Sequence, residues 1–63
     1  MENTVRIYLC NLAVLGQRCG YGEGSTLEAA IADALAYARA NGHADAAFNP
    51  DTRQVEFRGR VYL

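Results

Sequence analysis

Few side chains in this 63-residue chain could perform catalysis. The candidate nucleophiles are Cys10, Cys19 and Ser25, and the single histidine is His43. Nucleophilic catalysis requires a base within hydrogen-bond reach of the nucleophile, and the spacing of these residues indicates no such pair. Ser25 opens a helix-capping sequence, and an inward-facing cysteine is more often a small core residue than a nucleophile. We therefore predict that the protein is not an enzyme and has no catalytic residues.

Metal and cofactor sites are not predicted either. Two cysteines and one histidine give no paired ligand spacing of the kind that holds zinc. The glycine-rich residues 20–25 precede a helix, as phosphate-binding loops do. A Walker loop requires a lysine, which this chain lacks, and 63 residues are too few for a dinucleotide-binding unit. We interpret the glycines as a bend in a strand that leads into a helix, and we expect no cofactor, metal or small-molecule substrate.

The charge balance narrows the choice of partners. Six arginines stand against seven acidic residues, for a formal net charge of −1. Binding of nucleic acid normally appears as a basic excess, so a nucleic-acid partner is not favoured. The N-terminal residues do not resemble a signal peptide, and no apolar run approaches the ~20 residues that span a bilayer. We expect a cytoplasmic protein without a membrane partner.

The length predicts one domain, residues 1–63, near the lower limit for independent folding. Chains of this size usually gain stability from disulfides, metals or oligomerisation. Two cysteines allow at most one disulfide, and whether Cys10 and Cys19 pair stays open. We therefore expect a homodimer.

Two strands are predicted before the helix. Residues 4–9 alternate strictly, with Val5, Ile7 and Leu9 on the side that would face the core. Residues 13–22 form a second extended run, in which glycines mark a bulge or bend. These two runs should form an antiparallel pair.

One helix is predicted over residues 25–41. Ser25 and Glu28 match the capping box, and Gly42 stands where a left-handed residue would end the helix. The stripe expected to pack on the sheet consists of Leu27, Ile31, Ala34, Leu35 and Ala38. The opposite face carries Ala29, Ala32, Ala36 and Ala40. That face is either ordinary exposed alanine or a smooth contact surface, and the sequence leaves both interpretations open.

A hairpin is predicted after the helix. Residues 44–49 and 53–63 read as strands, and residues 49–52, Asn-Pro-Asp-Thr, are a strong turn signal. The predicted fold is α+β in the order β-β-α-β-β. Its antiparallel sheet of three to four strands has one helix packed on one face, so the other face is open to solvent or to a partner.

Residues 19–30 read Cys-Gly-Tyr-Gly-Glu-Gly-Ser-Thr-Leu-Glu-Ala-Ala. This stretch resembles HicB-like antitoxins, in which a cysteine-containing turn is followed by Gly-Asp-Thr-Leu-Glu-Glu-Ala at the helix start. The resemblance implies a partial ribonuclease-H-like β-β-α-β module that binds and blocks a toxin. We expect these 63 residues to lack the separate DNA-binding segment usual in that family. The same join looks like the end of double-stranded-RNA-binding domains, but their lysines are absent.

The sequence therefore predicts a small non-catalytic protein-binding module, an inhibitor or regulator that occludes a partner protein. Antitoxin-like regulators and phage-encoded inhibitors of a host complex are the candidate settings. The alternative is a nucleic-acid-binding module that uses the open sheet face, because arginines and aromatic rings stack on single strands. Charged residues that prevent sheet-to-sheet aggregation would explain the same pattern. The candidate partner-binding residues are Arg6, Tyr8, Glu56, Arg58, Arg60 and Tyr62.

Overall fold

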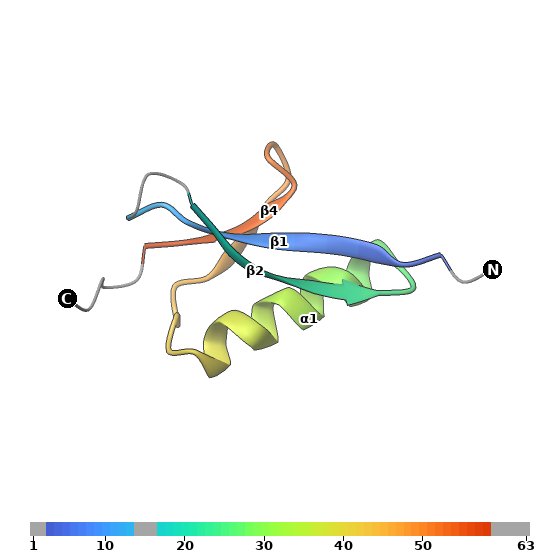
Figure 1. Cartoon of the computed structure of the whole chain (residues 1–63), viewed down its shortest axis with the longest axis horizontal. Coiled ribbons are helices and arrows are strands. Elements are labelled where there is room, and N and C mark those ends of the chain that lie inside the picture. Colours follow the sequence, from blue (N-terminus) through green and yellow to red (C-terminus); the bar gives the residue numbers. More distant parts are fainter. Residues whose placement is uncertain (1–2, 14–16, 59–63) are drawn as a thin grey trace.

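The computed structural model describes residues 3–13 and 17–58. Two strands, one helix and two strands follow one another along the chain, and the strands form one four-stranded sheet in the order β2-β1-β4-β3 (Figure 1). The elements are β1 Val5–Asn11, β2 Gln17–Gly24, α1 Leu27–Ala40, β3 Ala47–Asn49 and β4 Gln54–Phe57. The prediction of an α+β fold is confirmed. Parts of two predicted strands, residues 14–16 and 59–63, lie outside the described residues.

The sheet is mixed, so the prediction of a wholly antiparallel sheet is wrong. β1 pairs with β2 in antiparallel fashion and with β4 in parallel fashion, and β3 pairs with β4 as an antiparallel hairpin. The reason is the number of chain reversals. The chain reverses direction between successive elements, so the first and the fifth element run the same way (Figure 1). Each hairpin is antiparallel within itself, and the two hairpins meet at a parallel seam.

The helix packs on β2 through glycines. A Cβ atom at Gly22 would lie 2.8 Å from the Cβ atom of Ala34 and would collide with the backbone of that residue. A Cβ atom at Gly24 would lie 2.7 Å from Ala29 Cβ. Glycine leaves the space that close backbone approach requires. Gly22 and Gly24 therefore make room for α1, a role that differs from the predicted bend. A register shift between Leu9 and Cys10 marks a β-bulge close to Gly20.

The close approach decides which residues of α1 are buried. Ala30, Ala34 and Ala38 are fully buried, whereas Leu27 is 39% exposed. Ile31 and Leu35 are partly buried at the edge of the core. The burial predicted for Ala34 and Ala38 is confirmed, whereas Ala30 is buried and Leu27 is exposed, because only a methyl group fits between the helix and a glycine-lined strand. The rest of the buried core consists of Ile7, Leu9, Ala46, Val55 and Phe57.

The two helix ends agree with the sequence to different degrees. Thr26, and not Ser25, is the N-cap: its Oγ1 accepts a hydrogen bond from the Ala29 amide at 3.1 Å. Gly42 has a φ of +90°, and its amide donates to the Arg39 carbonyl at 3.0 Å. The His43 amide donates to the Ala38 carbonyl, also at 3.0 Å. These two bonds form a Schellman motif, so the predicted end at Gly42 is confirmed.

The turn between β3 and β4 begins at Asn49, as predicted. The Asn49 side chain accepts a hydrogen bond from the Asp51 amide at 2.9 Å, and its carbonyl accepts one from the Arg53 amide at 2.8 Å. Arg53 takes a left-handed φ of +57° to close the turn. Within the described residues the two strands are shorter than predicted.

Residues 3–13 and 17–58 contain no helix that is long and apolar enough to cross a membrane.

Candidate functional site

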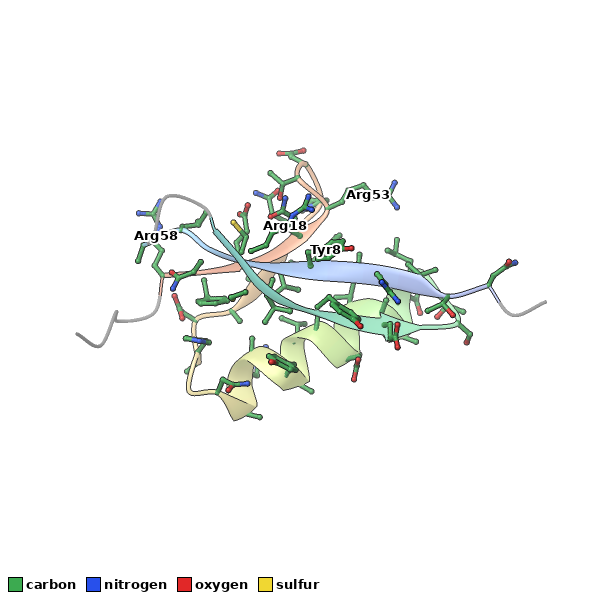
Figure 2. The ribbon with its side chains drawn as sticks, in the orientation of Figure 1. Tyr8, Arg18, Arg53 and Arg58 are labelled. Carbon is green, nitrogen blue, oxygen red and sulfur yellow. The ribbon has the colours of Figure 1, made fainter. Side chains whose placement is uncertain are left out.

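No described element covers the face of the sheet opposite α1, which we call the bare face. Ile7 and Leu9 point into the core, so Arg6 and Tyr8 point to the bare face because side chains alternate along a strand. Arg6 lies opposite Glu23 of β2, and Tyr8 lies opposite Tyr21. Figure 2 shows Tyr8 and Arg18 on the side of the sheet away from the helix.

Four side chains from β1 and β2 contact one another on the bare face, and we call them the Arg–Tyr cluster: Arg6, Tyr8, Arg18 and Tyr21. The guanidinium carbon of Arg18 lies 4.6 Å from the centre of the Tyr8 ring. The rings of Tyr8 and Tyr21 meet edge to face, with their centres 5.9 Å apart. The guanidinium carbon of Arg6 lies 4.7 Å from the centre of the Tyr21 ring. Both arginine–tyrosine distances are within the range of cation–π attraction.

The two arginines of the cluster differ in their charge partners. Arg6 forms an ion pair with Glu23 at 3.3 Å. The neighbouring Tyr21 phenol, a hydrogen bond with Tyr8 and the Glu23 carboxylate all raise the pKa of Arg6 above its ordinary value. This ion pair is the one found among residues 3–13 and 17–58, and in that part of the chain no carboxylate pairs with Arg18. Arg18 therefore presents a charge that a partner could bind.

The structure places only some of the predicted site residues together. Arg6 and Tyr8 belong to the cluster, whereas Glu56 lies on the bare face of β4 and Arg58 directly follows that strand. The Glu56 carboxylate accepts hydrogen bonds from Asn49 Nδ2 at 2.9 Å and from Thr52 Oγ1 at 3.0 Å. Glu56 therefore stabilises the hairpin. Arg60 and Tyr62 lie outside the described residues.

Sequence reasoning missed Arg18 and Tyr21. The two residues are an odd number of positions apart, so simple alternation places them on opposite faces of a strand. The β-bulge adds one residue to β2 between them: Tyr8 lies opposite Tyr21, but Cys10 lies opposite Arg18. The bulge therefore returns both side chains to one face. The glycine at position 20 was the available signal.

The remaining reactive groups do not converge on a site. Cys10 is buried and Cys19 is exposed. Partial burial, with a smaller contribution from nearby Cys10, raises the pKa of the Cys19 thiol and so lowers its thiolate content. His43 stacks on Phe57, with ring centres 3.9 Å apart. Within the described ranges, no three histidine, cysteine or acidic side chains gather to hold a metal ion.

Comparisons with protein-family models, with curated proteins and with solved structures found no match to this chain. The resemblance of residues 19–30 to HicB-like antitoxins therefore stays a prediction. The Arg–Tyr cluster is the strongest candidate for a functional site in the described part of the chain.

Proposed function

We propose that the protein is a non-catalytic binding module that occludes a partner protein with its bare face. The single observation that carries this proposal is the stacking of Arg18 on Tyr8 and of Arg6 on Tyr21. Arginine and tyrosine are enriched among the residues that dominate binding energy in protein interfaces. Stacking also holds these long side chains in place before binding, which lowers the entropy lost when a partner docks.

A protein partner explains the cluster better than a nucleic acid does. Each tyrosine ring already has a guanidinium within stacking distance, whereas a single-stranded nucleic acid would stack its bases on free ring faces. Arg6 is partly neutralised by Glu23, and the whole chain carries a net charge of −1. Phosphate binding gains most from an excess of positive charge. Binding of nucleic acid is therefore the second candidate.

The mode of action that we propose is occlusion, as in an antitoxin-like regulator or a phage-encoded inhibitor of a host complex. Occlusion requires only a surface that fits the partner, which suits a chain whose reactive groups do not converge. The expected cytoplasmic location stays a prediction.

We also propose that the protein is a homodimer. Leu27, Ile31 and Leu35 lie four residues apart along one flank of α1, where Leu27 is exposed and the other two are only partly buried. A second copy that packs on this flank would remove apolar surface from water. The bare face stays available to a partner in such a dimer.

Photo-crosslinking tests the protein-binding proposal. A benzophenone amino acid replaces Tyr21 of the bare face or, as the matched control, Tyr37 of α1; these tyrosines are 42% and 49% exposed. In the native host, we expect a crosslinked protein from position 21 and none from position 37. Arg18→Glu should abolish the product, and the matched charge reversal Arg39→Glu on the helix should retain it.

Two results would overturn the proposal. Crosslinks from position 37 alone, or from neither position, would remove the bare face as the binding surface. An adduct from position 21 that nuclease destroys would replace the protein partner with a nucleic acid.

A further inference from the structure

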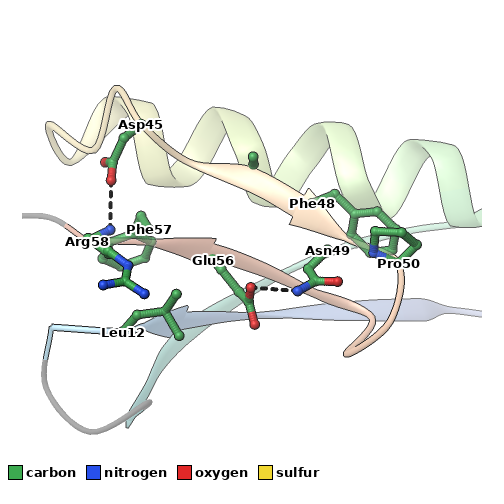
Figure 3. A pocket seen from close by; sticks show the side chains of 9 residues that line it. Leu12, Asp45, Phe48, Asn49, Pro50, Glu56, Phe57 and Arg58 are labelled. Atoms are coloured by element: carbon green, nitrogen blue, oxygen red, sulfur yellow. Dashed lines mark hydrogen bonds between the residues drawn. The ribbon is translucent and has the colours of Figure 1, made fainter.

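A hollow of about 370 Å³ lies beside the hairpin of β3 and β4 (Figure 3). Its size is at the lower end of the range for small-molecule sites. The lining combines apolar groups with three kinds of polar side chain, and the residues that matter here are Leu12, Ala47, Asn49, Glu56, Phe57 and Arg58. The short side chain of Ala47, which is exposed on β3, leaves space between its larger neighbours.

The charged side chains at the hollow differ in whether they already have a bonding partner within the described residues. The Asp45 carboxylate accepts a hydrogen bond from the Arg58 backbone amide at 2.7 Å (Figure 3). The Glu56 carboxylate accepts two hydrogen bonds, from Asn49 and from Thr52. In the described part of the chain, the Arg58 guanidinium pairs with no carboxylate. The two acids therefore hold the chain in place, and the cation is available.

We infer that this hollow receives an apolar side chain of the partner protein, and that Arg58 binds a carboxylate next to that side chain. The inference rests on the proposed function and names the chemistry of the partner segment. A guanidinium binds a carboxylate through two parallel hydrogen bonds, which makes the contact directional. Asp45 and Glu56 would repel a polyanion, so an isolated carboxylate fits this hollow better than a phosphate backbone.

One row of the sheet joins the hollow to the Arg–Tyr cluster. In the sheet register Arg18 lies opposite Cys10, Cys10 lies beside Glu56, and Glu56 lies opposite Ala47. This row crosses all four strands, a distance of about 14 Å at the usual strand spacing. An extended segment of about four residues spans that distance. One acidic-apolar segment of the partner can therefore contact both Arg18 and the hollow.

A fragment titration followed by amide NMR tests the inference. The probe is N-acetyl-L-phenylalanine, which joins an aromatic side chain to a carboxylate, and the matched control is its neutral carboxamide. We expect a dissociation constant on the order of 1 mM for the acid, from the affinity typical of each ligand atom. The amides of Leu12, Ala47 and Arg58 should shift most, and the carboxamide should bind about tenfold more weakly.

Three variants identify the contacts. Arg58→Gln retains the hydrogen bond from the backbone amide to Asp45. It should lower the affinity for N-acetyl-L-phenylalanine about tenfold, to the affinity of the carboxamide. Ala47→Leu fills the hollow and should abolish binding of both probes, while amide dispersion verifies that the variant is folded. Arg39→Gln removes a positive charge from α1 and should leave both affinities unchanged.

Shifts confined to other residues, no shifts at all, or equal affinity of acid and carboxamide would overturn the inference. An affinity for N-acetyl-L-phenylalanine that is unchanged in Arg58→Gln would also overturn it. A failed titration combined with crosslinks from position 21 would remove the hollow and retain the proposed function. Binding in the hollow without crosslinks from position 21 would overturn the proposed function. It would also overturn the inference that a segment of a partner protein occupies the hollow.

Discussion

Several polar side chains of this protein hold the chain in place and are thereby withdrawn from binding. Glu56 uses both carboxylate oxygens to fasten the β3–β4 hairpin, and Asp45 accepts the amide that follows β4. Asp33 of α1 accepts a hydrogen bond from the Glu23 amide at 2.9 Å and so ties the helix to strand β2. At the residue scale, these bonds engage Asp33, Asp45 and Glu56, whereas Arg18 and Arg58 form no ion pair within the described residues.

Thr26 provides the first test at this scale. Its Oγ1 caps α1, so Thr26→Ala should lower the free energy of unfolding by about 1 kcal/mol. Ser25→Ala is the matched control and should change the free energy of unfolding by only a few tenths of a kcal/mol. Urea unfolding of both variants measures the difference. A larger loss from Ser25→Ala would show that the capping box read from the sequence is the correct one.

Cys19 provides a test of pH dependence. Partial burial, together with Cys10 nearby, raises the pKa of this largely exposed thiol, so its neutral form persists to higher pH. The rate of alkylation by iodoacetamide follows the thiolate and should therefore rise with a midpoint above the ordinary 9.0. Mass spectrometry of Cys19, with Cys19→Ser as the control, measures the profile. A midpoint below 9.0 would refute the assignment.

At the scale of elements, the fold depends on the contact between α1 and β2. Gly22 and Gly24 face the helix, and the buried alanines of α1 fill the narrow space. The pairing of small residues on both elements brings the two backbones together. This contact sets the position of β2, and β2 in turn supplies Arg18 and Tyr21 to the bare face.

The element scale also explains what sequence could predict. Strict alternation predicted the core side of β1, and Gly42 predicted the helix end, because both depend on local geometry. The burial of Ala30 in place of Leu27 depends on a strand distant in the sequence. The parallel seam between β1 and β4 depends on all five elements, and the cluster depends on a one-residue bulge. Local patterns carry little of that information.

Gly22→Ala tests the contact between α1 and β2. The added methyl group collides with the backbone of Ala34, so the free energy of unfolding should fall by about 3 kcal/mol or more. Gly42→Ala is the control: nothing lies within 4 Å of the added atom, and only its φ of +90° opposes the change. Its cost should be about 1 kcal/mol. Equal losses in urea unfolding would contradict close packing at Gly22.

At the scale of the whole molecule, the helix covers one face of the sheet and leaves the other face bare, so the protein has two different surfaces. The helix side carries the partly covered apolar flank of Leu27, Ile31 and Leu35, and the other side carries the Arg–Tyr cluster. Figure 2 shows Arg18, Arg53 and Arg58 on the side away from α1. The proposed self-association and the proposed partner binding therefore use different faces.

Light scattering in solution tests the dimer. We expect twice the chain mass of 6.9 kDa, and we expect Leu27→Glu to give the single mass because it places a charge in the apolar flank. Arg18→Glu on the opposite face serves as the control and should leave the dimer intact. A wild-type protein of single mass at high concentration would contradict the proposal.

The most direct test of the central claim is the affinity for the crosslinked partner, measured by calorimetry with Tyr8→Ala and with Tyr37→Ala. The Arg–Tyr cluster predicts that Tyr8→Ala weakens binding about 30-fold, as truncation of an interface hot spot does. Tyr37→Ala, on the helix side, should change the affinity less than twofold, within the range of neutral surface changes. An unchanged affinity for Tyr8→Ala, together with a large loss for Tyr37→Ala, would contradict the assignment of the bare face as the binding surface.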